Sequence, residues 1–151
     1  MIIDLKNLKQ KGLKTARFDF SYVPPEDLMS LPDGKFVGEV KVTANVEAYD
    51  DEAYVDGVIE YTFNAACARC LSPTTTTRKI EYDELFISEF SSKRDEDGYV
   101  YTREKIDLTK MVDELILTDI PYAVYCKEDC KGLCPVCGKN LNDGDCGCKN
   151  S

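Results

Sequence analysis

The sequence contains no histidine, and this absence narrows the range of functions. Histidine is the side chain that most often exchanges protons near neutral pH, so histidine-based catalytic triads are excluded. The chain also has no glycine-rich phosphate-binding loop and no nucleophile elbow. Its acidic runs at 50–52 and 95–97 lie in turn-like segments, without the apolar pocket that a general acid needs. We therefore predict that the protein is not an enzyme.

Long apolar runs are missing as well. The longest is the five-residue stretch from Tyr122 to Cys126, whereas a membrane-spanning helix needs about 20 apolar residues. The chain begins Met1-Ile2-Ile3-Asp4, which lacks the charged-then-apolar pattern of an export signal. We expect a cytoplasmic protein that does not enter the membrane.

The charge is unevenly distributed along the chain. The net charge is −9, made up of +3 over residues 1–20, −12 over residues 21–125 and 0 over residues 126–151. An acidic body repels phosphate and attracts basic partners, among which ribosomal proteins are common inside cells. The basic amino-terminal arm is the candidate for a weak direct contact with rRNA, although a solvated surface segment would look the same. Its basic residues are Lys6, Lys9, Lys11, Lys14 and Arg17.

Eight cysteines form the most informative pattern. Cys67 and Cys70 are separated by two residues, and the other six lie in the last 26 residues, at positions 126, 130, 134, 137, 146 and 148. Thiols stay reduced inside cells, so such clusters indicate metal ligands rather than disulfides. Eight ligands suffice for two tetrahedral four-cysteine sites. The segment Cys134-Pro-Val-Cys137-Gly-Lys is a zinc knuckle sequence, in which Gly138 lets backbone amides turn toward the sulfurs.

Three groupings of the cysteines remain open from the sequence. The favoured one has a first site of Cys134, Cys137, Cys146 and Cys148, closed over a short turn-rich loop, and a second of Cys67, Cys70, Cys126 and Cys130. The second grouping has one site at positions 126, 130, 134 and 137 and another at positions 67, 70, 146 and 148. The third is a single site with several free thiols.

The predicted cofactor is one or two structural Zn²⁺ ions. Four thiolates fill the coordination shell, whereas a catalytic zinc keeps one position for water. An iron–sulfur cluster also accepts four cysteines, so the spacing does not fix the metal. A redox role for the Cys67–Cys70 pair is a weaker alternative, because the strand–helix–strand context of such motifs is absent.

Hydrophobic periodicity predicts an α+β fold. Alternating apolar residues indicate strands near 18–22, 36–47, 55–63 and 74–86, with a short one near 99–101 after a polar loop at 91–98. Asp107 begins a helix near 107–118 with apolar residues at helical spacing, and Pro121 follows it. We expect an antiparallel β-sheet, or a partly open barrel, of five to six strands with one packed amphipathic helix. The body would cover residues 1–125, followed by a small cysteine-rich zinc-binding tail at 126–151.

Three segments together resemble the YceD-like family, the large-subunit ribosomal RNA accumulation proteins. They are Cys67-Ala-Arg-Cys70-Leu71, the helical segment from Ile106 to Pro121, and the tail from Cys126 to Asn142 with its following Cys146-Gly-Cys148. The resemblance implies a small cytoplasmic, non-enzymatic ribosome biogenesis factor that supports accumulation of large-subunit rRNA. Its partner would be a large-subunit precursor or a basic ribosomal protein. The alternative from the residues alone is a zinc or thiol module, acting as a zinc reserve or redox sensor.

Overall fold

The computed structural model describes residues 1–93 and 98–148. The acidic run at 95–97, half of the polar loop expected at 91–98 (residues 94–97), and the last three residues of the expected tail lie outside these ranges. The strands are β1 (Ile2–Asp4), β2 (Thr15–Tyr22), β3 (Lys35–Phe36), β4 (Val40–Ala48), β5 (Glu52–Ala66), β6 (Pro73–Ser88), β7 (Tyr99–Tyr101) and β8 (Lys105–Asp107). The helices are α1 (Leu5–Gln10) and α2 (Thr109–Asp119), with 3₁₀ turns η1 (Glu26–Leu28) and η2 (Leu141–Asp143).

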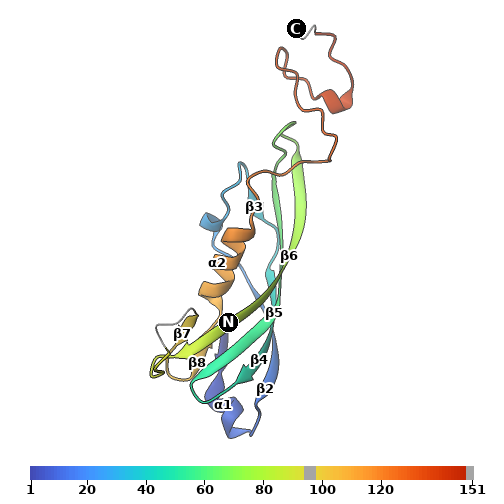
Figure 1. Ribbon diagram of the computed structural model, residues 1–151. Helices are drawn as coiled ribbons and strands as arrows, with labels where there is room; N and C mark the ends of the chain where they lie inside the picture. The colour runs from blue at the N-terminus through green and yellow to red at the C-terminus, as the bar shows by residue number, and fades with distance from the viewer. Residues whose placement is uncertain (94–97, 149–151) are drawn as a thin grey trace.

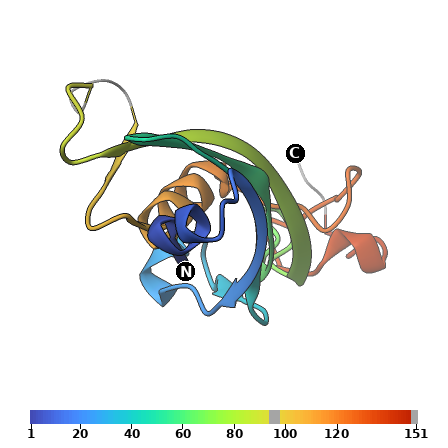
Figure 2. The same ribbon diagram turned by 90° about the horizontal axis from the view of Figure 1, so that it is seen from below.

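Six strands form one curved sheet in the order β2-β4-β5-β6-β7, with β3 also paired to β5. All neighbours are antiparallel except β6 and β7, which run parallel, and β1 and β8 form a separate antiparallel pair. The sheet bends in an arc around α2 (Figure 2), and α1 lies at the end of the body away from the cysteine-rich end (Figure 1). The predicted α+β class, with an antiparallel sheet of five to six strands, one main helix and a cysteine-rich end, is confirmed; the parallel β7 makes the sheet mixed.

The core lies between the concave face of the sheet and α2. Strand β4 alternates buried and accessible residues along its length, as its sequence predicted, so that one face enters the core and the other meets solvent. Helix α2 contributes side chains at helical spacing. Fully or almost fully buried residues from the sheet and the helix include Val42, Ala44, Ile59, Phe63, Phe86, Met111, Val112 and Ile116.

Gly57, in the middle of β5, permits a close approach of the β4 backbone. A Cβ atom on this residue would lie 1.9 Å from the carbonyl oxygen of Thr43, closer than any real side-chain contact. That carbonyl accepts a hydrogen bond from the Tyr82 hydroxyl at 2.6 Å, while the amide of Val58 donates to Oγ1 of Thr43 at 3.0 Å. Glycine at this position therefore lets an aromatic residue of β6 cover the backbone of β4.

Four side chains of the sheet anchor α2 in the arc by hydrogen bonds to its carboxylates. The hydroxyls of Tyr22, Tyr61 and Tyr99, from three different strands, each donate to a carboxylate of the helix at 2.7 Å. The Arg78 guanidinium of β6 forms the fourth anchor, to Asp119. The Asp107 carboxylate accepts the amide of Thr109 at 2.9 Å, although Asp107 itself ends β8 and the helix starts two residues later than predicted. This anchoring fixes the point at which the chain leaves α2 for the cysteine-rich end.

Strands β5 and β6 form a long hairpin that extends past the rest of the sheet (Figure 1). They have 15 and 16 residues and pair from Glu52–Ile87 to Ala66–Pro73. The segment after α2 reaches the tip of this hairpin, and η2 lies beyond it (Figure 1). The two ends of the molecule are thus the curved body and the cysteine-rich tip.

Candidate metal centre

The eight cysteines gather into two groups of four in space. The proximal cluster contains Cys67, Cys70, Cys126 and Cys130, and the distal cluster contains Cys134, Cys137, Cys146 and Cys148. Within each cluster all four sulfurs lie within 4.8 Å of one another, close enough to share one metal ion. All eight thiols are free, because no disulfide is formed among them. The structure therefore presents two clusters that could each hold a metal ion.

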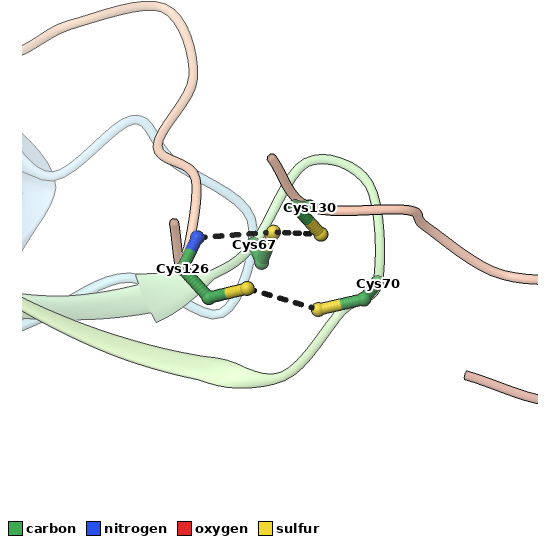
Figure 3. A group of neighbouring side chains, drawn as sticks. All are labelled: Cys67, Cys70, Cys126 and Cys130. Carbon is green, nitrogen blue, oxygen red and sulfur yellow. Dashed lines mark hydrogen bonds between the residues drawn. The ribbon is translucent and has the colours of Figure 1, made fainter. Parts of the chain in front are cut away.

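The proximal cluster joins two parts of the chain that are far apart in sequence (Figure 3). Cys67 and Cys70 lie in the turn between β5 and β6, and Cys126 and Cys130 come from the segment after α2. Their sulfurs are 3.7 Å apart for Cys67 and Cys130 and 3.6 Å apart for Cys70 and Cys126. A metal bound to four thiolates at about 2.3 Å would hold the sulfurs about 3.8 Å apart, so this spacing fits a tetrahedral ion. It is far too long for a disulfide.

Backbone amides face the proximal sulfurs. The amide of Cys126 donates to the Cys67 sulfur at 3.3 Å. Hydrogen bonding from the backbone of Cys70 lowers the pKa of the Cys67 thiol, whereas desolvation and the neighbouring thiols raise that of Cys126. A cation between the four sulfurs would favour the deprotonated form of all four thiols.

Arg69 clamps the segment after α2 against the hairpin turn. Its guanidinium donates to the carbonyl of Cys130 at 3.2 Å and to that of Glu128 at 3.4 Å. The same group lies 4.7 Å from the centre of the Tyr125 ring, within reach of a cation–π interaction. The amide of Ala68 adds a bond to the carbonyl of Val124 at 2.8 Å. Arg69 therefore holds both chain segments of the proximal cluster in place.

The distal cluster is built from two short turns. The amide of Val136 donates to the Cys134 sulfur at 3.4 Å, and the amide of Cys148 donates to that of Cys146 at the same distance. The residues that follow Cys137 and Cys146 are glycines with φ values of 76° and 75°, a conformation that other residues rarely adopt. Backbone hydrogen bonds from Cys137 and Val136 lower the pKa of the Cys134 thiol. Its ligands are more accessible overall than those of the proximal cluster.

The five basic residues near the amino terminus do not form a separate arm. Strand β1 pairs with β8, and Ile3, Leu5 and Leu8 are buried in the core, so the segment is part of the body. Lys6 and Lys9 lie on α1, Lys11 caps its end, Lys14 lies in the following loop and Arg17 is on β2.

Three of these basic residues have acidic neighbours within the body. Lys9 contacts Glu104 at 3.2 Å, while Lys14 and Arg17 each lie 3.8 Å from a carboxylate, those of Glu47 and Asp19. These pairings reduce the positive charge that the segment can offer to rRNA.

Comparison with known proteins places these features in a family. The family model described as large ribosomal RNA subunit accumulation protein YceD matches residues 55–151, which hold most of β5 together with β6, α2 and both clusters. The chain belongs to the YceD family. An uncharacterized protein of Mycobacterium tuberculosis is 33% identical over 150 residues, covering 93% of this chain and 70% of that protein. No solved structure matches.

Two further relatives of this chain come from other lineages. The uncharacterized protein YlbN of Bacillus subtilis is 28% identical over 135 residues, covering 88% of this chain and 78% of its own length. The chloroplastic large ribosomal RNA subunit accumulation protein YCED homolog 1 of Arabidopsis thaliana is 24% identical over 153 residues, covering 82% of this chain and 47% of its own length. Across residues 1–93 and 98–148, no helix has the length and apolar character needed to cross a membrane.

Proposed function

We propose that this YceD-family protein is a non-enzymatic, cytoplasmic ribosome biogenesis factor that supports accumulation of large-subunit rRNA. The family match over residues 55–151 carries this proposal, since the family is named for that role. The Arabidopsis relative carries the same name. The four-cysteine clusters support the non-enzymatic part, because four thiolates leave no coordination position for a substrate or a reactive water.

The outer face of the sheet carries acidic residues that suit a basic partner. The register places Asp56 of β5 directly opposite Asp83 of β6, with Glu81 next along the same face. Like charges in directly opposed positions destabilise a sheet. A cationic partner would relieve this repulsion and gain favourable electrostatic energy. We propose that this face binds a basic ribosomal protein or the protein part of a large-subunit precursor.

Structural Zn²⁺ fits both clusters as their resident metal. A donor set of four thiolates is the one that structural zinc prefers, and a bound ion would offset their negative charge. The sulfur spacing in the proximal cluster fits tetrahedral coordination. We propose a body over residues 1–125 and a tail over 126–151 that zinc fastens together, since the proximal cluster takes two ligands from each. Metal binding would supply folding free energy only to the segments that carry the ligands.

Depletion of the protein from its host tests the proposed role. Ribosome profiles should show a selective shortage of large subunits and of their rRNA, while small subunits stay at their normal level. A normal profile after complete depletion would contradict the proposal.

Binding to the outer face can be tested with charge-matched variants. The double variant Asp56→Asn/Asp83→Asn should co-sediment less with large-subunit precursors at moderate salt, and should be slightly more stable because the opposed charges are gone. The control Glu26→Gln/Asp27→Asn removes two exposed acidic charges from η1 and should bind as the unmodified protein does. Equal loss of binding in both variants would show that net charge, rather than this face, is responsible.

A zinc or thiol module is the second candidate, and the exposure of the distal cluster favours it. Cys137 is exposed and Cys146 and Cys148 are half-buried, so a chelator or oxidant can reach them. This function requires zinc that exchanges within minutes or thiols that react at neutral pH. Slow exchange together with inert thiols would leave only a structural role for the metal.

A further inference from the structure

Asn142 of η2 connects the two clusters. It lies in the loop between Cys137 and Cys146, inside the chain segment that the distal cluster closes. Its side chain, however, reaches the proximal cluster: Nδ2 donates to the sulfur of Cys130 at 3.3 Å. Its Oδ1 accepts the backbone amide of Lys131 at 2.9 Å. One side chain thus binds a ligand of the proximal cluster and the residue beside that ligand.

The fold of the distal loop determines where Asn142 lies. Its amide donates to Oδ1 of Asn140 at 3.0 Å, which caps the start of η2. The neighbouring amide of Leu141 donates to the carbonyl of Gly132 at 2.8 Å, and Leu133 forms an antiparallel bridge with Asn140. This loop begins and ends at distal cysteines, so its closure depends on what holds those cysteines together.

Hydrogen bonds to metal-bound thiolates affect metal affinity. An N–H group directed at a thiolate disperses its negative charge and fixes its orientation, and removal of such outer-sphere partners costs about 10–100-fold in affinity. Cys130 is 5% exposed, so solvent has little access to replace the Asn142 donor. The bond from Asn142 is therefore placed to strengthen metal binding in the proximal cluster.

We propose that Asn142 couples the two metal sites, so that loading of the distal cluster raises the affinity of the proximal one. With the distal site loaded, the closed loop presents Asn142 to Cys130; with it empty, the loop loses its closure and the donor is no longer held. Coupling between binding sites is reciprocal, so proximal loading strengthens the distal site by the same factor. This inference rests on the two zinc sites of the proposed function. It adds that the two sites bind Zn²⁺ cooperatively.

A double-mutant cycle on the full-length protein tests the coupling. Zn²⁺ affinity of the proximal cluster is measured by competition with a chelator, in the native background and in Cys146→Ser/Cys148→Ser, which removes the distal site. Asn142→Ala should weaken the proximal site about 10-fold in the native background. It should have no further effect once the distal site is gone. The control Asp143→Ala alters an exposed neighbour in the same 3₁₀ turn and should leave the affinity unchanged.

The outcomes separate this inference from the proposals it rests on. If the native protein binds two Zn²⁺ ions but Asn142→Ala weakens the proximal site equally in both backgrounds, or in neither, the coupling is wrong and the two zinc sites stand. If the native protein binds fewer than two ions, both the second site and the coupling are wrong. The ribosome profile tests the role in rRNA accumulation independently of either result.

Discussion

The Arg78 guanidinium of β6 donates to both carboxylate oxygens of Asp119, from Nε at 2.7 Å and from Nη2 at 3.2 Å. Asp119 is the last residue of α2, where a negative charge is disfavoured by the helix dipole. The paired guanidinium offsets that cost, and the Tyr61 hydroxyl adds a third bond to the same carboxylate. This arrangement locks the end of the helix to the sheet just before the chain leaves for the cysteine clusters.

The hydrogen bonds of Asp119 should make the free energy of unfolding depend on pH in the acidic range. Bonding to Arg78 lowers the pKa of Asp119 below its ordinary value of 3.8. A lowered carboxyl pKa stabilises the fold above the ordinary value, and the benefit disappears as pH falls through the lowered one. The midpoint of urea unfolding should therefore decrease from pH 5 to pH 3 in the native protein, and less so in Asp119→Asn.

The substitution Asp119→Asn should lower the free energy of unfolding by about 1–3 kcal/mol at pH 7, because hydrogen bonds to a charged group are lost. Asp27→Asn, at an exposed position on η1, serves as the control and should change neither stability nor its pH dependence. An identical acid response in Asp119→Asn and the native protein would assign the pH dependence to other groups.

Gly57→Ala should destabilise the sheet by at least about 2 kcal/mol, because its Cβ has no room beside the Thr43 carbonyl and the backbones of β4 and β5 would have to separate. Thermal unfolding measures the effect. Tyr82→Phe keeps the ring and removes only the hydroxyl bond to Thr43, so its cost should be smaller, about 1 kcal/mol. A Gly57→Ala variant that melts at the same temperature as the native protein would contradict this account of the close approach between β4 and β5.

The substitution Arg69→Ala should speed the release of metal from the proximal cluster, relative to the native protein, more than it speeds release from the distal cluster. The variant loses both carbonyl contacts that hold the segment around Cys130, so we expect roughly 10-fold faster transfer of proximal Zn²⁺ to a chelator. Arg69→Lys should recover little, since lysine lacks the planar fork that reaches two carbonyls. Lys127→Ala, at an exposed position nearby, is the control. If the rate of metal release from the proximal cluster is unchanged in Arg69→Ala, Arg69 does not stabilise metal binding in that cluster.

Chelation should unfold the cysteine-rich end and leave the sheet folded. Hydrogen exchange should increase for amides in 67–72 and 126–148, since their order depends on the ligands. Amides of Val42 and Ile59, in the core of the sheet, should stay protected. Loss of protection throughout the chain would mean that the proximal cluster stabilises the whole body.

An element can be predicted from the sequence when its own hydrophobic pattern stabilises it, and not when contacts with distant segments do. Strand β4 and helix α2 were predictable because their own hydrophobic periodicity matches the face that they bury. The three-residue β1 and the six-residue α1 were not, because Ile3, Leu5 and Leu8 acquire order only through contacts with distant segments. For the same reason the basic segment looked like an arm when only its charge was considered.

The cysteine clusters show a similar division. Their number and spacing indicated metal binding from the sequence, and the short loop between Cys137 and Cys146 favoured one grouping. Loop-closure costs rise too slowly with loop length to exclude the other groupings. The roles of Arg69 and Asn142 were missed. Arg69 was visible as the residue between Cys67 and Cys70, but the carbonyls that it contacts come from a separate segment. Asn142 gave no signal beyond that of a turn-rich loop.

The β5–β6 hairpin sets a distance as well as a shape. From the acidic face at Asp56 to the end of β5 at Ala66, ten residue steps of about 3.3 Å each measure at most roughly 33 Å. The hairpin therefore sets the distance between the acidic face and the cysteine-rich tip. A partner engaged at both ends must present two surfaces at that separation. Side chains alternate between the two faces of a strand. Deleting two consecutive residues from β5 and their two paired residues from β6 would therefore shorten the hairpin by about 7 Å and keep every remaining side chain on its own face. The spacing can therefore be varied without altering the chemistry of either end.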